Sequence, residues 1–254
     1  MKRKFAYTLV VAGLLSILSA CAPNPPPEFV AWSSQERAQT QIELGFSYLE
    51  RDMVDIARES FQTAIQVDPK SSEAYHGLGL VEAKALNLDL ALEYLGKSVA
   101  FDGQNISAVS DYAIMLCREG VASKGVAVLQ KNVKEYSQLG VATRLAFGRC
   151  YQADNQPDKA IAAYQSVLEI EPNLPQALLS MARLKFERQN YLSASAFLQR
   201  YFYTNTISSD ALLLAANVEQ LLNNPEERDY YTQILWSRYP RSEQAIRARE
   251  LYSQ

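Results

Sequence analysis

Cysteine and histidine offer the most chemistry in this chain, and they are scarce. The 254 residues contain three cysteines, Cys21, Cys117 and Cys150, and a single histidine, His76. A thiol can accept a lipid or form a disulfide, whereas a lone histidine lacks the companions that a metal site or a catalytic triad needs. The sequence also has no glycine-rich phosphate loop and no Gly-x-Ser-x-Gly turn. We therefore expect no enzyme, no metal and no small-molecule substrate, with His76 lying in a groove or between helices.

The first cysteine follows a segment typical of protein export. Three basic residues at positions 2–4 precede an apolar run over residues 5–18, which is too short to span a bilayer comfortably. The run ends in Leu-Ser-Ala-Cys at residues 18–21, which resembles the bacterial lipobox. This resemblance implies a signal peptide over residues 1–20 and a covalent lipid on Cys21, with no other cofactor. The alternative is a secretory signal with a chance cysteine near its cleavage site.

The residues after Cys21 indicate where such a lipoprotein would go. In the lipoproteins that this segment resembles, an aspartate after the cysteine often retains the protein in the inner membrane, so Ala22 favours transfer by the sorting machinery to the outer membrane. The proline-rich stretch over residues 23–27 cannot form a helix or sheet. We expect residues 21–37 to be an extended tether, with the folded part on the periplasmic face.

Charge and hydropathy exclude two classes of function. The formal net charge of the chain is −3, and loss of the three basic residues at positions 2–4 makes the mature protein more acidic. Nucleic-acid binding needs a concentrated basic surface, so we expect no nucleic-acid partner. After the signal, no apolar stretch is long and charge-free enough for a transmembrane helix.

A repeat runs through the rest of the chain. A small residue recurs at intervals of 34 or 35, and fixed spacings after it hold a small residue, a large apolar residue and a turn residue. The recurring small residues are Gly45, Gly79, Ala113, Gly148, Ala182 and Ala216. The first repeat, with Tyr48, Ala57, Phe61 and Pro69, shows the pattern most fully.

This pattern resembles the tetratricopeptide repeat. The resemblance implies an all-α, right-handed superhelical solenoid of six helix-turn-helix units, in which small residues sit where helices cross and aromatic residues fill the space between hairpins. The expected domain spans residues 38–254, with repeats near 38–71, 72–105, 106–140, 141–174, 175–208 and 209–242, followed by a C-terminal helix.

Two repeats depart from the pattern. In the third, Gly125 and Ser137 replace the expected small residue and proline, and in the sixth, Arg228 and Thr232 replace a small and a large residue. A terminal repeat is free to differ because one side faces solvent. The third repeat lies inside the array, so we expect a kink or a softer joint there, with local unfolding starting at this joint or at the C-terminus.

In the tetratricopeptide family the first helix of each hairpin lines a concave groove. Helical spacing predicts that the side chains turned into this groove are apolar in the first three repeats: Ile42, Phe46, Leu49, His76, Leu80 and Ile114. An exposed apolar surface of this kind usually binds a protein, as an extended strand or an amphipathic helix. Two alternatives are that residues 28–37 fold back over the groove, or that the helix phase is wrong by one position.

Cys117 and Cys150 fall near the ends of the first helices of the third and fourth repeats. These hairpins are neighbours in the expected stack, so a disulfide between the two residues is one outcome in an oxidising periplasm. Two free buried thiols are the other. A disulfide would lock the joint that the irregular third repeat leaves soft.

The lipobox, the proline tether and six such repeats together resemble the pilotins of type IV pilus systems, the PilF/PilW family. Residues 38–45 and 111–113 are similar to early repeats of that family. The resemblance implies an outer-membrane lipoprotein that binds subunits of the pilus secretin and promotes their localisation and multimerisation. The contact is expected around Ile42, Phe46 and Leu49.

Two other functions stay open at this stage. A tetratricopeptide lipoprotein can serve as an adaptor for cell-wall synthesis or for insertion of outer-membrane barrels. An enzyme with a site hidden in the groove would need a cluster of titratable residues, which the sequence does not show.

Overall fold

The computed structural model describes residues 33–135 and 139–252, so the predicted signal peptide, Cys21, Ala22 and most of the tether lie outside the described residues. The described part of the chain consists of α-helices joined by short turns. The helices are α1 (Ser34–Glu50), α2 (Val54–Val67), α3 (Ser72–Lys84), α4 (Leu88–Phe101), α5 (Ile106–Arg118), α6 (Ala122–Asn132), α7 (Val141–Ala153), α8 (Pro157–Ile170), α9 (Pro175–Glu187), α10 (Tyr191–Tyr203), α11 (Ser209–Leu221), α12 (Pro225–Arg238) and α13 (Glu243–Tyr252).

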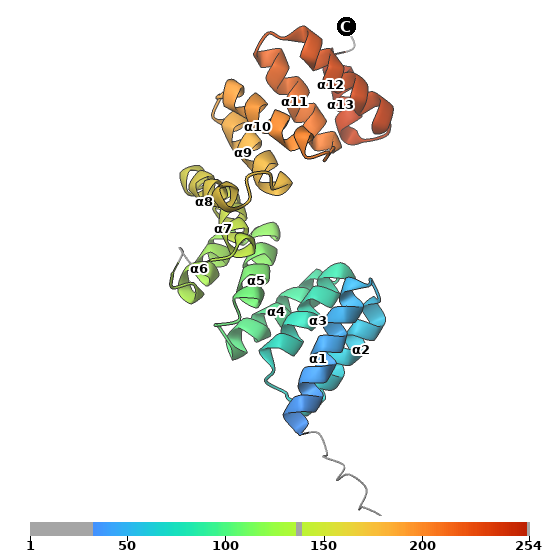
Figure 1. Ribbon diagram of the computed structural model, residues 1–254, viewed down its shortest axis with the longest axis vertical. Coiled ribbons are helices and arrows are strands. Elements are labelled where there is room, and N and C mark those ends of the chain that lie inside the picture. The colour runs from blue at the N-terminus through green and yellow to red at the C-terminus, as the bar shows by residue number, and fades with distance from the viewer. Residues whose placement is uncertain (1–32, 136–138, 253–254) are drawn as a thin grey trace, which may run out of the picture.

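Consecutive helices pair as hairpins that follow one another along the long axis of the molecule (Figure 1). Each of the pairs from α1/α2 to α11/α12 packs mainly within itself and then against the next pair, while α13 packs on α11 and α12. The fold is the tetratricopeptide fold expected from the repeat. Helices α3, α5, α7, α9 and α11 begin at the first residues of the second to sixth expected repeats.

The first helix begins earlier than the sequence analysis suggested. Ser33 Oγ accepts a hydrogen bond from Glu36 N, and Glu36 Oε2 accepts one from Ser33 N at 2.7 Å. This reciprocal capping box satisfies two backbone donors that a helix start would otherwise leave free. Residues 34–37, which we had assigned to the tether, are therefore the first turn of α1.

A left-handed residue reverses the chain inside every hairpin. It stands seven positions after the recurring small residue of its repeat, and its φ lies between 53° and 80°. The six residues are Asp52, Leu86, Gly120, Asn155, Gln189 and Asn223. Glycine and asparagine adopt this conformation easily, whereas Leu86 does so at a steric cost. The repeat thus fixes the tight turn as well as the packing.

The recurring small residues allow aromatic rings to enter the helix crossings. Phe61 of α2 is fully buried between α1 and α3. A Cβ added at Gly45 would lie 2.6 Å from the Phe61 ring, and one added at Gly77 would overlap the same ring. Because both helices present glycine to this ring, one large side chain fills the space between the first two hairpins.

Buried carboxylates join neighbouring elements in the second and sixth hairpins. Glu82 accepts hydrogen bonds from Arg58 Nε at 2.8 Å and from Asn87 Nδ2 at 2.7 Å. Glu219 stands at the same repeat position and accepts from Ser195 Oγ at 2.7 Å and from Asn224 Nδ2. In both cases the asparagine lies five residues after the glutamate, in the turn of the hairpin. Each glutamate therefore connects the turn of its own hairpin to the second helix of the preceding hairpin.

Burial acts on the pKa of Glu82 in one direction and its partners act in the other. Burial alone would raise this pKa, but the hydrogen bonds from Arg58 and Asn87, together with the charge of Arg58, outweigh it. The net result is a pKa below the ordinary value of 4.5. Glu82 is thus held as a carboxylate, paired with the guanidinium of the preceding hairpin.

Candidate partner-binding groove

One side chain on the first helix of each hairpin follows directly after the recurring small residue. It is apolar in the first three hairpins and polar in the last three: Phe46, Leu80, Ile114, Arg149, Arg183 and Asn217. This row of side chains, which we call the ladder, follows the face that the first helices share. The ladder changes character between α5 and α7.

The residues predicted to line the groove differ in their exposure. Phe46, Leu49, Leu80 and Ile114 are half-buried, so each keeps some surface open to a partner. Ile42 and His76 are only 5% and 7% exposed. Ile42 packs in the core of the first hairpins. These two residues therefore belong to the packed interior and do not form an open surface of the predicted groove.

Aromatic and polar contacts join the first three hairpins beneath this face. The ring of Phe46 meets that of Phe61 edge-on, with 5.0 Å between centroids, and lies 6.0 Å from the ring of His76. His76 Nε2 donates a hydrogen bond of 2.8 Å to Asp111 Oδ2 on α5. His76 is thus a satisfied polar residue between helices, and its partner Asp111 could not be identified from the sequence pattern.

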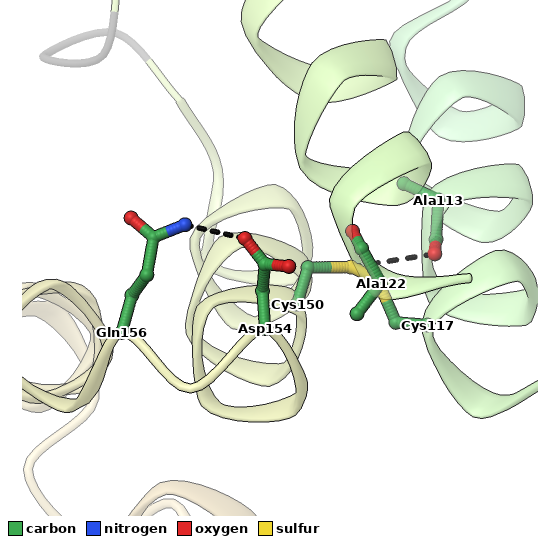
Figure 2. Close-up of a disulfide and its surroundings, with 6 residues drawn as sticks. All are labelled: Ala113, Cys117, Ala122, Cys150, Asp154 and Gln156. Carbon is green, nitrogen blue, oxygen red and sulfur yellow. Dashed lines mark hydrogen bonds between the residues drawn. A yellow bond between two sulfur atoms is a disulfide. The ribbon is translucent and has the colours of Figure 1, made fainter. Parts of the chain in front are cut away.

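A disulfide connects the two helices between which the ladder changes. Cys117 of α5 and Cys150 of α7 are bonded, with their Cα atoms 5.3 Å apart. Figure 2 shows the bond crossing between the ends of these helices, with Cys150 directed towards the carbonyl of Ala113. Ser110 Oγ also donates to Thr143 Oγ1 at 3.0 Å between the same helices. The joint is therefore closed by a covalent and a polar contact.

Gly125 of α6 makes room for this disulfide. A Cβ at this position would overlap Cys117 Sγ and would lie 2.8 Å from the Ala113 carbonyl oxygen and 3.3 Å from Cys150 Sγ. In the repeat pattern Gly125 marks the third repeat as irregular. The structure gives the reason for this glycine, because an alanine side chain would not fit against the disulfide.

Two features are absent from the described residues. No group of three or more His, Cys, Asp or Glu side chains in residues 33–135 and 139–252 is placed to hold a metal ion. Within the same ranges, no helix has the length and apolar character needed to cross a bilayer.

Comparison with known proteins agrees with the fold. The tetratricopeptide repeat family matches residues 151–218. The type IV pilus assembly protein PilF of Pseudomonas aeruginosa (strain PAO1) is 23% identical over 239 residues, which cover 92% of each chain. Cellulose synthase 1 operon protein C of Komagataeibacter xylinus is 25% identical over 194 residues, but these cover only 14% of that protein. The first of these similarities extends over nearly the whole chain, and the second is confined to a small part of the larger protein.

Two solved structures resemble this one over most of their length. The structure of Pseudomonas aeruginosa PilF has a TM-score of 0.75 at 21% identity, covering 86% of this chain and 99% of that one. The structure of PilW, described as a widely conserved type IV pilus biogenesis factor, has a TM-score of 0.75 at 21% identity, covering 83% and 97%. At such identities the structural likeness speaks for the fold alone. The chain thus has the tetratricopeptide-repeat fold and is similar over most of its length to the type IV pilus assembly proteins PilF and PilW.

Proposed function

We propose that the chain is a pilotin, an outer-membrane lipoprotein that binds subunits of the type IV pilus secretin and promotes their outer-membrane localisation and multimerisation. The main support is the similarity to a type IV pilus assembly protein over 92% of both chains. A protein that shared only the repeat would match over part of one of the chains, as the cellulose synthase operon protein does. Tetratricopeptide arrays are scaffolds for other proteins, which agrees with an accompanying role.

The N-terminal half of the ladder is the proposed contact for the secretin. Phe46, Leu80 and Ile114 are half-buried apolar residues at equivalent positions of three adjacent hairpins. Such a row suits the apolar side chains of an extended or helical segment of the partner. Binding would cover secretin segments that otherwise pair with one another before they insert.

The lipid on Cys21 is the proposed anchor. Several acyl chains on one residue hold a protein on a membrane almost permanently, because each buried CH₂ contributes about 0.8 kcal/mol. Replacing Cys21 by serine should release the protein into the periplasmic fraction and abolish its labelling with radioactive palmitate. A Cys21→Ser protein that stays in the outer membrane and is still labelled would disprove this anchor.

The test of the pilotin role is deletion in the host, followed by membrane fractionation and unheated gels for secretin multimers. We expect multimers to be lost and to return with the wild-type chain. Leu80→Glu should fail to restore them, because it places a charge in the ladder. Leu90→Glu is the matched control, since Leu90 is 42% exposed and lies on α4, the second helix of the same hairpin.

Leu80 is a better probe than Phe46, because Phe46 packs on Phe61 and its loss would disturb the core. Circular dichroism of both variants checks that they fold. Unchanged multimers in the deletion strain would overturn the proposal and favour an adaptor for cell-wall synthesis or barrel assembly. Restoration by Leu80→Glu would overturn the placement of the contact.

A further inference from the structure

A pocket opens where the ladder changes from apolar to basic. Ile114, Cys117 and Arg118 of α5 line it together with Arg149 and Ala153 of α7, and its volume is about 290 Å³. The surface that it exposes is almost wholly apolar. The disulfide fixes the distance between its two walls, because Cys117 belongs to the lining and Cys150 follows Arg149. The pocket is thus preformed and has room for a large apolar side chain.

Two arginines at the pocket lack the carboxylates that the repeat supplies elsewhere. Arg183 stands at the ladder position of Arg149 in the next hairpin and pairs with Asp210 at 3.2 Å. The residue equivalent to Asp210, one repeat earlier, is Gln176. The repeat thus places an amide, and no carboxylate, at the position that would pair with Arg149.

Arg118 on α5 also lacks the carboxylate partner that its repeat equivalent has. Lys84 stands at the position of Arg118 in the preceding hairpin and pairs with Asp52 at 2.7 Å. The residue equivalent to Asp52, one repeat later, is Leu86. Both arginines are exposed, and within residues 33–135 and 139–252 neither makes an ion pair or a side-chain hydrogen bond. Two guanidinium groups at the edge of one apolar pocket are thus free to donate hydrogen bonds to carboxylates from outside the chain.

We propose that this pocket binds an extended segment of a partner protein in which an acidic side chain stands next to a large apolar one. The apolar side chain enters between Ile114 and Ala153, and the carboxylate pairs with Arg118 and Arg149. The ladder continues on both sides of the pocket, with Leu80 on α3 and Arg183 on α9. An internal segment can therefore run through the site, so a chain terminus is not required.

This site does not depend on the pilotin role. It shares Ile114 with the proposed secretin contact and differs from it in the two arginines, which would repel a basic segment and leave a neutral one without its ion pairs. Any protein segment with an acidic side chain next to a large apolar one should bind here, so the test uses peptides and not the secretin.

The probe is a phage-displayed library of random ten-residue peptides. The full-length protein, purified from membranes and held in lipid nanodiscs, is the target, and empty nanodiscs remove peptides that bind lipid. We expect the selected peptides to be enriched in Asp or Glu beside Leu, Ile or Phe. Peptides selected on the double variant Arg118→Ser with Arg149→Ser should not be enriched in Asp or Glu. The matched control, Arg51→Ser with Arg241→Ser, removes two exposed arginines outside the pocket, and peptides selected on it should still be enriched in Asp or Glu.

A selected peptide is then compared with its Glu→Gln form by fluorescence anisotropy. The acidic form should bind the wild-type protein at least about tenfold more tightly, as expected for charge-assisted contacts to two guanidinium groups. The double variant should bind both forms equally. Ala153→Phe, which fills the pocket and keeps both arginines, should weaken both forms alike. The proposal is wrong if no peptide is selected, if acidic residues are not enriched, or if the double variant keeps its preference for the acidic form.

Discussion

Gly125 lies against Cys117 so closely that any side chain at residue 125 would overlap the sulfur of the disulfide. The two residues belong to α6 and α5 of the same hairpin. Their contact explains why the third repeat has glycine where four of the other five have alanine. The irregular repeat and the disulfide are therefore one feature of the sequence.

Restoring the repeat residue at this position should destabilise the protein. Gly125→Ala adds a methyl group where no space exists, and overpacking of this kind costs about 1–3 kcal/mol. The higher helix propensity of alanine offsets part of that loss. Urea unfolding under oxidising conditions measures the effect. The penalty should be smaller in a background that carries Cys117→Ala and Cys150→Ala, and an equal penalty there would show that the sulfur is not its cause.

Removal of the disulfide should lower the free energy of unfolding without changing the fold. The cysteines are 33 residues apart, and closing a loop of that length contributes about 3–4 kcal/mol in the chain-entropy model. The double variant Cys117→Ala with Cys150→Ala should therefore unfold at lower urea concentration. Reduction of the wild-type protein should give a similar shift, whereas reduction of the variant should have no effect.

Replacing Leu86 should stabilise the protein. Its φ is 64° and its side chain is 79% exposed. The left-handed backbone is therefore strained at this residue, and burial of the side chain offsets little of that strain. Leu86→Asn should raise stability by about 0.5–1 kcal/mol, since asparagine tolerates this conformation better. The control is Leu221→Asn on α11, where the side chain is 52% exposed and the backbone is helical. A thermal melt in which both variants lose stability would contradict the prediction.

The Glu82 contact should make stability depend on pH in the acid range. Its pKa in the folded protein lies below the ordinary value of 4.5, so its contribution is present above that pH and is lost as the pH falls through the lower folded value. Glu82→Gln should cost about 1–3 kcal/mol at pH 7, because Arg58 and Asn87 lose a charged acceptor that is itself buried. Urea unfolding at a series of pH values should show this difference shrinking below pH 4.5. A difference that stays constant would assign it to packing.

The repeat made the hairpins predictable from the sequence, because every small residue of the pattern lies on a first helix of the structure. The tight turns also obey the period, and asparagine at residues 155 and 223 would have marked them. The start of α1 does not follow from the repeat, because it is set by the capping box between Ser33 and Glu36. Local hydrogen bonds of this kind do not follow the repeat.

The groove was harder to predict than the helices. Helical spacing placed Phe46, Leu80 and Ile114 on one row, but it could not tell that Ile42 and His76 lie beneath neighbouring hairpins. Burial of those two depends on how far each hairpin rotates relative to the next, which no spacing within one repeat records. Asp111, the hydrogen-bond partner of His76, is offset by one residue from the repeat position of His76, so the repeat does not pair the two residues.

The disulfide has a mechanical consequence for a molecule that is pulled from its two ends. In a solenoid each hairpin holds only its neighbours, so tension travels along the backbone through every unit in turn. The bond from Cys117 to Cys150 gives that tension a covalent shortcut past residues 118–149, which include α6 and most of α7. Under load this stretch of chain cannot lengthen, and extension must begin in the helices outside it.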